Sequence, residues 1–181
     1  MKYTKLIVLA LALLLVLTLV SCNKQESEQP QESAAEQSTE ASKQGNAPNF
    51  AVLDENGKRV ELTDFYGKPV VLNFWATWCG YCVMEMPDFN KAYGEYPEVA
   101  FMMIDATDGV YETVDMAKEF VAAQGYSFDI YFDVLGQAAY AYQVTGYPTT
   151  VFIDANGDVV SIQTGMISYE TLIEGLELIT E

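Results

Sequence analysis

VVLNFWATWCGYC, residues 70–82, is the stretch that decides the fold of this chain. Its first part, Val70 to Ala76, is apolar except for Asn73, as expected of a central strand that is covered on both faces. Cys79 and Cys82 follow directly, where the strand should give way to a helix. Because free amides and the dipole at a helix N-terminus stabilise a thiolate, this position favours Cys79 as the reactive thiol.

Two other interpretations of this cysteine pair are a zinc site and a structural disulfide. A zinc site needs about four ligands. The chain has no histidine, and its third cysteine, Cys22, lies far from the pair. A structural bridge that closes a two-residue loop removes little entropy from the unfolded chain. The spacing therefore favours redox chemistry, in which the two thiols make and break a disulfide.

Residues 1–21 have the pattern of an export signal. Lys2 and Lys5 give a basic start, Leu6 to Val20 is almost wholly apolar, and Leu19 to Cys22 resembles a lipoprotein cleavage box. An uncleaved membrane anchor is the alternative, but a spanning helix needs about 20 apolar residues. We therefore expect a signal peptide over residues 1–21, a lipid on Cys22, and the mature chain on the extracytoplasmic face of the cell membrane.

The chain is strongly acidic, with a formal net charge of −17 at pH 7. Residues 1–21 carry two lysines and no acid, so their removal would change this charge to −19. Such an excess of negative charge argues against nucleic acid as a partner and against broad electrostatic adhesion to anionic lipid. A well-solvated surface accounts for most of it.

The mature chain divides into a polar segment and one folded domain. Residues 23–46 are rich in Gln, Glu, Ser and Ala and cannot bury enough apolar surface to fold. Residues 22–46 are therefore predicted to be a lipidated cysteine and a disordered tether, with a span of roughly 25–30 Å for a flexible coil. The remaining residues, 47–181, suffice for one domain.

Alternating strands and helices fill this domain. Asn56-Gly57 and Asn156-Gly157 predict β-hairpins over residues 50–62 and 149–162. Between the hairpins we expect a helix after the cysteines that Pro87 should kink, followed by strand 99–104, helix 112–124, strand 128–132 and short helix 137–143. Ser168 should cap a last helix. This alternation predicts a three-layer α/β sandwich.

Three motifs together resemble the thioredoxin superfamily: FWATWCGYC at 74–82, EMP at 85–87 and GYPTT at 146–150. More narrowly, residues 47–181 resemble the membrane-tethered thiol–disulfide reductases of the TlpA and ResA group. The resemblance implies a thioredoxin-like sandwich with a central mixed sheet, an N-terminal β-hairpin and an inserted helical segment near 112–124.

The resemblance also implies roles for the residues around the thiols. Cys79 would attack a substrate disulfide, and Cys82 would resolve the mixed disulfide. Glu85 matches a glutamate of the group and, one helical turn after Cys82, is the best local candidate for a proton carrier. An equally weighted alternative is that Glu85 is merely an acid favoured by the dipole in the early turns of a helix.

Substrate contacts are implied at two places in the chain. Pro148 matches the cis-proline of the superfamily, whose loop would let Tyr147 present backbone groups to an extended substrate. Trp75 is expected in the core. Asn73 stands where cytoplasmic thioredoxins carry a buried acid, and Gly80-Tyr81 lacks the proline of the most reducing thioredoxins. The residues that should border the substrate are Trp78, Gly80, Tyr81, Tyr147 and Pro148.

The leading hypothesis is a lipid-anchored, extracytoplasmic protein-disulfide reductase that needs no cofactor. Its partners would be a membrane electron donor of the thiol-transporting type and disulfide-containing exported proteins, such as oxidised apocytochrome c or damaged proteins. A thiol peroxidase is an alternative because residues 62–65 also fit that branch, although Pro69 lies outside its Pro-x-x-x-Thr pattern. A copper carrier is another, although its distant histidine is missing here.

Overall fold

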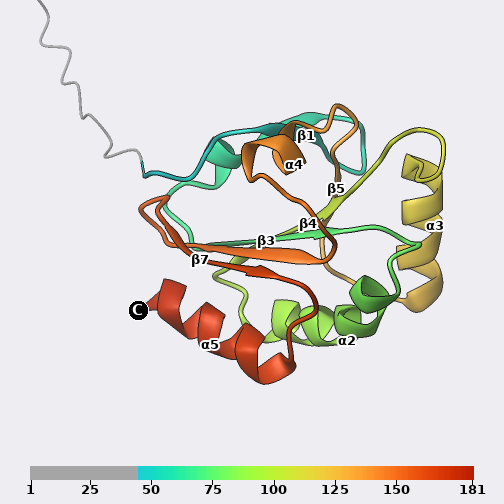
Figure 1. Ribbon diagram of the computed structural model, residues 1–181. Coiled ribbons are helices and arrows are strands. Elements are labelled where there is room, and N and C mark those ends of the chain that lie inside the picture. The colour runs from blue at the N-terminus through green and yellow to red at the C-terminus, as the bar shows by residue number, and fades with distance from the viewer. Residues whose placement is uncertain (1–44) are drawn as a thin grey trace, which may run out of the picture. The chain divides into compact units, whose positions relative to one another are not determined.

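β3, Val70–Trp75, is the central strand of the domain, and all six of its residues are buried. The computed structural model describes residues 45–181 (Figure 1). On one side β3 pairs in parallel with β4, Ala100–Asp105, and on the other it pairs antiparallel with β6, Thr149–Ile153. A strand between two others needs cover on both faces, which explains its near-continuous apolar sequence.

The sheet has seven strands in the order β2-β1-β5-β4-β3-β6-β7. β3, β4 and β5 are parallel to one another, whereas β1, β2, β6 and β7 add antiparallel pairings at the two sides. The predicted central mixed sheet is therefore confirmed. The bounds of the outer strands are Ala51–Leu53 for β1, Arg59–Glu61 for β2, Ile130–Phe132 for β5 and Val159–Thr164 for β7.

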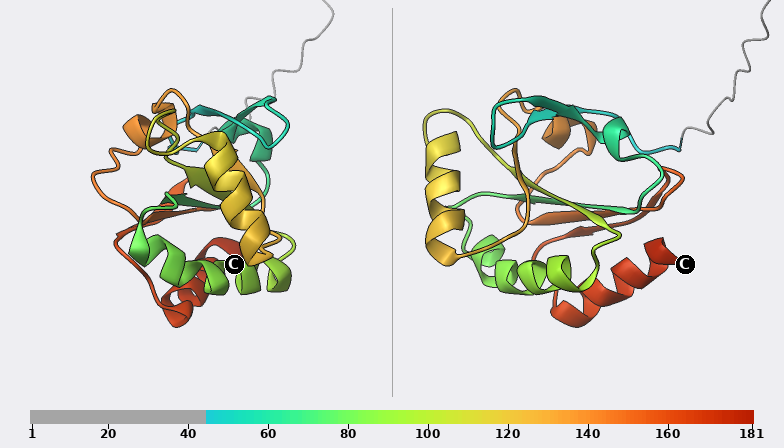
Figure 2. Two further views of the ribbon diagram at one scale, coloured as in Figure 1. Left: turned by 90° about the vertical axis from the view of Figure 1, so that its right-hand side faces the viewer. Right: turned by 180° about the vertical axis from the view of Figure 1, so that it is seen from behind.

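Helices cover both faces of this sheet. α2 and α5 lie side by side on one face and the short α4 lies on the other, while α3 stands beside the carboxyl end of β3 (Figures 1 and 2). The predicted three-layer α/β sandwich is confirmed. The helical elements are η1 at Leu62–Phe65, α2 at Gly80–Glu95, α3 at Val114–Gln124, α4 at Gln137–Ala141 and α5 at Tyr169–Thr180.

The alternation of side chains along β3 divides the core in two. Val71 and Trp75 pack with α2, α3 and α5, whereas Leu72 and Phe74 pack with α4 and the N-terminal hairpin. Trp75 is fully buried, as the sequence predicts. Asn73 shares the face of Val71 and Trp75, so its amide points toward α2.

Both predicted hairpins form, and each has an aspartate that organises its turn. Asp54 accepts the amides of Asn56 and Lys58 through Oδ1, and the pairing of β1 with β2 follows. Asp154 accepts equivalent amides between β6 and β7. Gly57 and Gly157 take positive φ values, which a glycine adopts without strain.

The ends of several helices differ from their predicted limits. α3 begins at Val114, capped by the Thr113 hydroxyl, so the predicted start at Glu112 is wrong by two residues. α4 ends at Ala141, and the positive φ of Gln143 excludes the predicted extension. Ser168 does cap α5, and Gly125 ends α3.

α2 continues through Pro87 without a break, so the proline does not end this helix. The bend expected at Pro87 stays a prediction. The predicted inward positions of the helix include Met86 and Phe89, which are buried to 0% and 1% exposure.

The N-terminal predictions fall largely outside the described residues. The signal peptide at 1–21, the lipid on Cys22 and the tether up to residue 44 all lie there. Asn46, assigned to the tether, exchanges hydrogen bonds with Asp158 and Val159 at the β6–β7 turn. Contacts with the domain thus begin before Ala47. From residue 45 onward, no helix combines the length and apolar character that crossing a membrane requires.

The close approach of α5 to β6 predicts a stability difference between two glycine substitutions. A Cβ at Gly175 would lie 2.3 Å from the Phe152 ring, which is itself buried, so Gly175→Ala should cost about 1–3 kcal/mol of unfolding free energy. The control is Gly94→Ala in α2, where nothing lies within 4 Å, and a gain of up to about 1 kcal/mol is expected there. Urea unfolding measures both, and equal effects would contradict the packing.

Candidate active site

Cys79 and Cys82 lie where β3 gives way to α2, and they are joined by a disulfide with a Cα–Cα distance of 5.3 Å. Cys79 is the N-cap residue of α2, and its Sγ accepts the backbone amide of Cys82 at 3.2 Å. This amide is one of the donors that a helix leaves without an intrahelical partner. The structure thus places Cys79 at the helix N-terminus, where the sequence predicts it, and its role as the attacking thiol stays a prediction.

The two sulfur-bearing residues differ in access to solvent. Cys79 retains 7% exposure and Cys82 retains none. Around them, Trp78 and Tyr81 are exposed to 59% and 65%, and Gly80 is exposed as well. An incoming sulfur can therefore reach Cys79 more readily than Cys82, which supports the predicted order of attack without testing it.

The Tyr147-Pro148 peptide bond is cis, as expected from the motif. Pro148 is buried, and β6 begins immediately after it and pairs with β3. The Tyr147 ring packs edge to face against Trp78, with ring centroids 5.8 Å apart. The structure therefore brings both predicted substrate-binding segments together, although their contact with substrate stays a prediction.

Glu85 is buried at 2% exposure beneath this site. Its Oε1 accepts the side-chain amide of Asn73 at 2.8 Å, and its Oε2 accepts the backbone amide of Ile167 at 3.0 Å. Asn73 also donates to Thr150 Oγ1 at 3.1 Å, which links β3, β6 and α2. Burial raises the pKa of Glu85 from 4.5 to about 7, although the two hydrogen bonds favour the charged form.

This environment bears on the two interpretations of Glu85. An acid that merely complements a helix dipole gains most of its benefit at the surface of the first turn. Burial instead leaves Glu85 able to gain or lose a proton near neutral pH, which is what a general acid or base requires. Its role as a proton carrier for Cys82 stays a prediction.

Two further acids at the same end of the sheet were missed in the sequence. Asp105 ends β4 in register with Trp75, and Glu112 precedes α3; both are fully buried. Glu112 Oε2 accepts both the amide and the hydroxyl of Thr77, at 3.2 and 2.8 Å. The available signal was the position of Asp105, at the carboxyl end of the strand next to the cysteine-bearing one.

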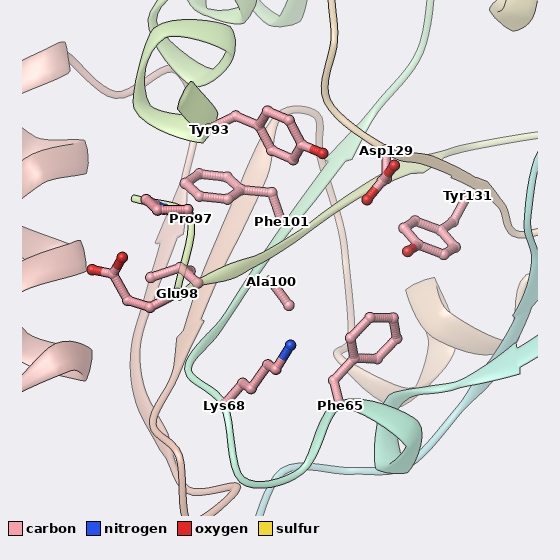
Figure 3. Close-up of a pocket in the computed structure, with 10 residues that line it drawn as sticks. Phe65, Lys68, Tyr93, Pro97, Glu98, Ala100, Phe101, Asp129 and Tyr131 are labelled. Carbon is pink, nitrogen blue, oxygen red and sulfur yellow. The ribbon is translucent and has the colours of Figure 1, made fainter. Parts of the chain in front are cut away.

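A pocket of about 320 Å³ lies at the opposite end of β4 and includes none of the predicted site residues. Its lining combines aromatic rings from Phe65, Tyr93 and Phe101 with the ammonium group of Lys68, as Figure 3 shows. The dithiol therefore does not belong to this pocket. Within residues 45–181, no group of three or more His, Cys, Asp or Glu side chains is arranged to hold a metal ion.

Comparison with protein families matches residues 44–162 to the AhpC/TSA family. Among characterised relatives, the thiol-disulfide oxidoreductase ResA of Bacillus thuringiensis subsp. konkukian is 41% identical over 136 residues. These residues cover 74% of this chain and 76% of the relative.

Solved structures show the same fold. A proposed thiol:disulfide interchange protein DsbE from Chlorobium tepidum is 30% identical with a TM-score of 0.68, over 76% of this chain and 97% of that one. The exposed lipoprotein thioredoxin Etrx1 of Streptococcus pneumoniae is 26% identical with a TM-score of 0.64, over 72% and 98%. These neighbours agree with the thioredoxin-like fold described above.

The raised pKa of Glu85 predicts a pH dependence of stability. Between pH 4.5 and 7 the folded protein holds a proton on Glu85 that the unfolded chain has released, so the contribution of Glu85 to stability should fall as pH rises through this range. Glu85→Gln should reduce this fall by about 3 kcal/mol, since one pKa unit corresponds to about 1.4 kcal/mol. Urea unfolding of the oxidised parent and variant, at several pH values from 4.5 to 7, measures this difference in unfolding free energy.

The matched control is Glu174→Gln, because Glu174 is exposed on α5. This substitution should leave the pH dependence of the parent protein unchanged. If Glu85→Gln also follows the parent curve from pH 4.5 to 7, Glu85 does not hold a proton in the folded state.

Proposed function

The chain belongs to the AhpC/TSA family of the thioredoxin superfamily and is a thiol-disulfide oxidoreductase, and we propose that it reduces disulfides of exported proteins at the extracytoplasmic face of the cell membrane. The observation that carries the proposal is the Cys79–Cys82 disulfide at the N-terminus of α2, with Cys79 alone accessible. The relatives named ResA support the same chemistry.

The proposed reaction begins with the reduced dithiol. The Cys79 thiolate attacks one sulfur of a substrate disulfide, so a Cys79–substrate bond forms while the second substrate sulfur leaves as a thiolate and takes a proton. Cys82 then loses its proton and attacks Cys79 Sγ, which releases the remaining substrate sulfur. The substrate gains two electrons, and the enzyme is left with the Cys79–Cys82 disulfide.

Glu85 is proposed to take the proton of Cys82 in the second step. Cys82 is fully buried, so water has little access to its thiol. Glu85 stands one helical turn farther along α2 and, with a pKa of about 7, exchanges protons near neutral pH. In the return step, a dithiol of a membrane electron donor would reduce the disulfide, and Glu85 would return the proton.

The surface around Cys79 suits a protein substrate. Trp78 and Tyr81 project from the start of α2, and Tyr147 precedes the cis-proline beside Trp78. Within residues 45–181, the amide and carbonyl of Tyr147 make no backbone hydrogen bond, so both are available to an extended substrate segment. Apocytochrome c with an oxidised haem-binding site and damaged exported proteins fit this description.

Location at the membrane is proposed from the N-terminal sequence. The LVSC segment at 19–22 would be processed so that Cys22 carries the lipid, and residues 23–46 would tether the domain. A solved relative described as an exposed lipoprotein thioredoxin supports this placement. A thiol peroxidase would instead consume hydrogen peroxide, which a peroxide assay distinguishes from disulfide reduction.

Substitution of Cys79 and substitution of Cys82 should block different steps of disulfide reduction. Cys79→Ser should abolish insulin reduction, because no attacking thiolate remains. Cys82→Ala should accumulate a mixed disulfide between Cys79 and the substrate, since nothing resolves it. Turnover measured by insulin precipitation and mass spectrometry of the trapped species check both, and undiminished turnover by Cys79→Ser would refute the assignment.

Substitution of Cys22, the third cysteine, is the matched control, because it should leave disulfide reduction intact. In the full chain, Cys22→Ala should leave insulin reduction unchanged but block both lipid labelling and normal cleavage of the signal peptide. Labelling with a radioactive fatty acid in the native host measures this. Equal labelling of parent and variant would show that Cys22 is not the lipid attachment site.

A further inference from the structure

Asp105 and Glu112 form a pair of fully buried acids whose carboxyl groups lie against each other. Asp105 comes from the end of β4, and Glu112 comes from the loop between β4 and α3. Thr107 donates its hydroxyl to Asp105 Oδ1, and Thr77 donates to Glu112 Oε2. Among residues 45–181, neither acid forms an ion pair.

A compact turn fixes Glu112 in this position. Asp108 Oδ1 accepts the backbone amides of Val110, Tyr111 and Glu112 at 2.7 to 3.0 Å. The Glu112 carbonyl in turn accepts the amides of Asp108 and Gly109 at 3.0 and 2.9 Å. The loop therefore closes on itself and directs the Glu112 side chain inward, toward Thr77.

Each of the two acids keeps one buried oxygen that has no hydrogen-bond partner among residues 45–181. These atoms are Asp105 Oδ2 and Glu112 Oε1. A buried oxygen without a hydrogen bond is costly, and two carboxyl groups in contact cannot both be charged at low cost. One proton shared between these two oxygens satisfies both. Burial and the neighbouring Glu112 charge raise the pKa of Asp105 to about 8, which places this proton on the pair at neutral pH.

We propose that Asp105 and Glu112 share one proton and act as a positioning pair, which holds Thr77 and thereby the Trp78-Cys79 segment in place for attack. Thr77 is two residues before Cys79, and the Cys79 amide closes the same turn by donating to Ala76 O at 3.1 Å. When the proton leaves, two negative charges remain in a site without solvent. Their repulsion loosens the Glu112–Thr77 hydrogen bonds and opposes formation of the Cys79 thiolate.

Three other titratable groups lie around the Asp105–Glu112 pair. Asp108 lies in the same loop, Asp133 follows β5 and donates its amide to Asp105 O, and Tyr147 approaches from the cis-proline loop. Asp133 is engaged by the amides of Ala138 and Ala139 at the start of α4. At the start of α2, Cys79 and Cys82 are joined in the disulfide and do not titrate in the oxidised protein. Glu85, the buried acid of α2, is directed to Asn73 and Ile167 instead.

The oxidised full chain gives the first test, because the disulfide-bonded Cys79 and Cys82 do not titrate and two backbone amides report on two different acids. The Thr77 amide donates to Glu112, and the Ile167 amide donates to Glu85. In an NMR pH titration, the Thr77 resonance should shift with a midpoint near 8 and that of Ile167 with a midpoint near 7. Asp105→Asn should abolish the Thr77 transition and retain that of Ile167.

The reduced protein gives the second test, through alkylation of Cys79 by iodoacetamide with the labelled residue identified by mass spectrometry. The rate ratio of Asp105→Asn to parent should be near one below pH 7 and should rise several-fold above pH 8.5, because only the parent acquires the second charge. Asp115→Asn, an exposed acid in the first turn of α3, is the control and should keep a constant ratio.

Substitutions of Glu112 test whether its side chain holds the Trp78-Cys79 segment in place. Glu112→Ala should lower kcat for insulin reduction by about tenfold, as expected for a misplaced reacting group. Glu112→Gln, which keeps an acceptor for Thr77, should restore most of it, and Glu119→Ala on the exposed face of α3 should have no effect. Should Glu112→Ala fail to fold, the Gln variant and the titrations decide.

The proposal rests on the proposed role of Cys79, yet the two can fail separately. A Thr77 resonance that does not titrate between pH 6 and 9.5, or that titrates identically in Asp105→Asn, overturns the shared proton whatever the activity. A constant alkylation ratio across this range, or full kcat in folded Glu112→Ala, overturns the link to the dithiol. The role of Cys79 as the attacking thiol is tested separately, and undiminished insulin reduction by Cys79→Ser would overturn it.

Discussion

The pairing of β3 with β4 on one side and β6 on the other determines where the dithiol, Asp105 and the cis-proline loop lie. Because β3 ends at Trp75, the dithiol follows at that edge of the sheet, and the parallel register with β4 delivers Asp105 to the same edge. The antiparallel register with β6 places the cis-proline loop there as well, since Thr149 pairs with Phe74. Three segments distant in sequence thus meet through backbone hydrogen bonds alone.

This arrangement forces polar groups into a largely apolar interior. Asn73, Glu85, Asp105 and Glu112 are all at 2% exposure or less. All but Asp105 have a hydrogen-bond partner from a distant part of the chain. Asn73 binds Glu85 across the space between β3 and α2, whereas Glu112 binds Thr77 from the loop before α3. Burial of these polar groups costs free energy that apolar residues at the same positions would not, and the proposed roles at the site account for this cost.

Much of the fold could be predicted from local signals. The apolar run of β3, the Asn-Gly turns, Gly125 and Ser168 act through neighbouring residues, and each produced the element that it predicts. The start of α3 was wrong because Asp108 gathers three amides into a turn that delays the helix, and such a turn has no periodic pattern.

The site residues likewise differ in how far the sequence could predict them. Cys79, Cys82 and Pro148 belong to short motifs, so their positions could be read from the sequence. The burial of Glu85 could not, because it depends on the amide of Ile167, 82 residues away. Asp105 has a partial signal, because it follows an apolar strand, whereas Glu112 resembles an ordinary surface acid in the sequence. Only the register of β4 with β3 and the closed loop reveal that both are buried beside Thr77.

The buried acids also bear on the direction of the reaction. A dithiol becomes more oxidising as its thiolate is stabilised, because that stabilises the reduced form. At the N-terminus of α2, the Cys82 amide and the helix dipole stabilise the Cys79 thiolate. Glu85, with a pKa of about 7, adds a negative charge one turn away from Cys82 as the pH rises, and Asp105 follows near pH 8. These charges oppose the dipole, so they move the dithiol toward the reducing side, in the sense that a reductase of exported proteins requires.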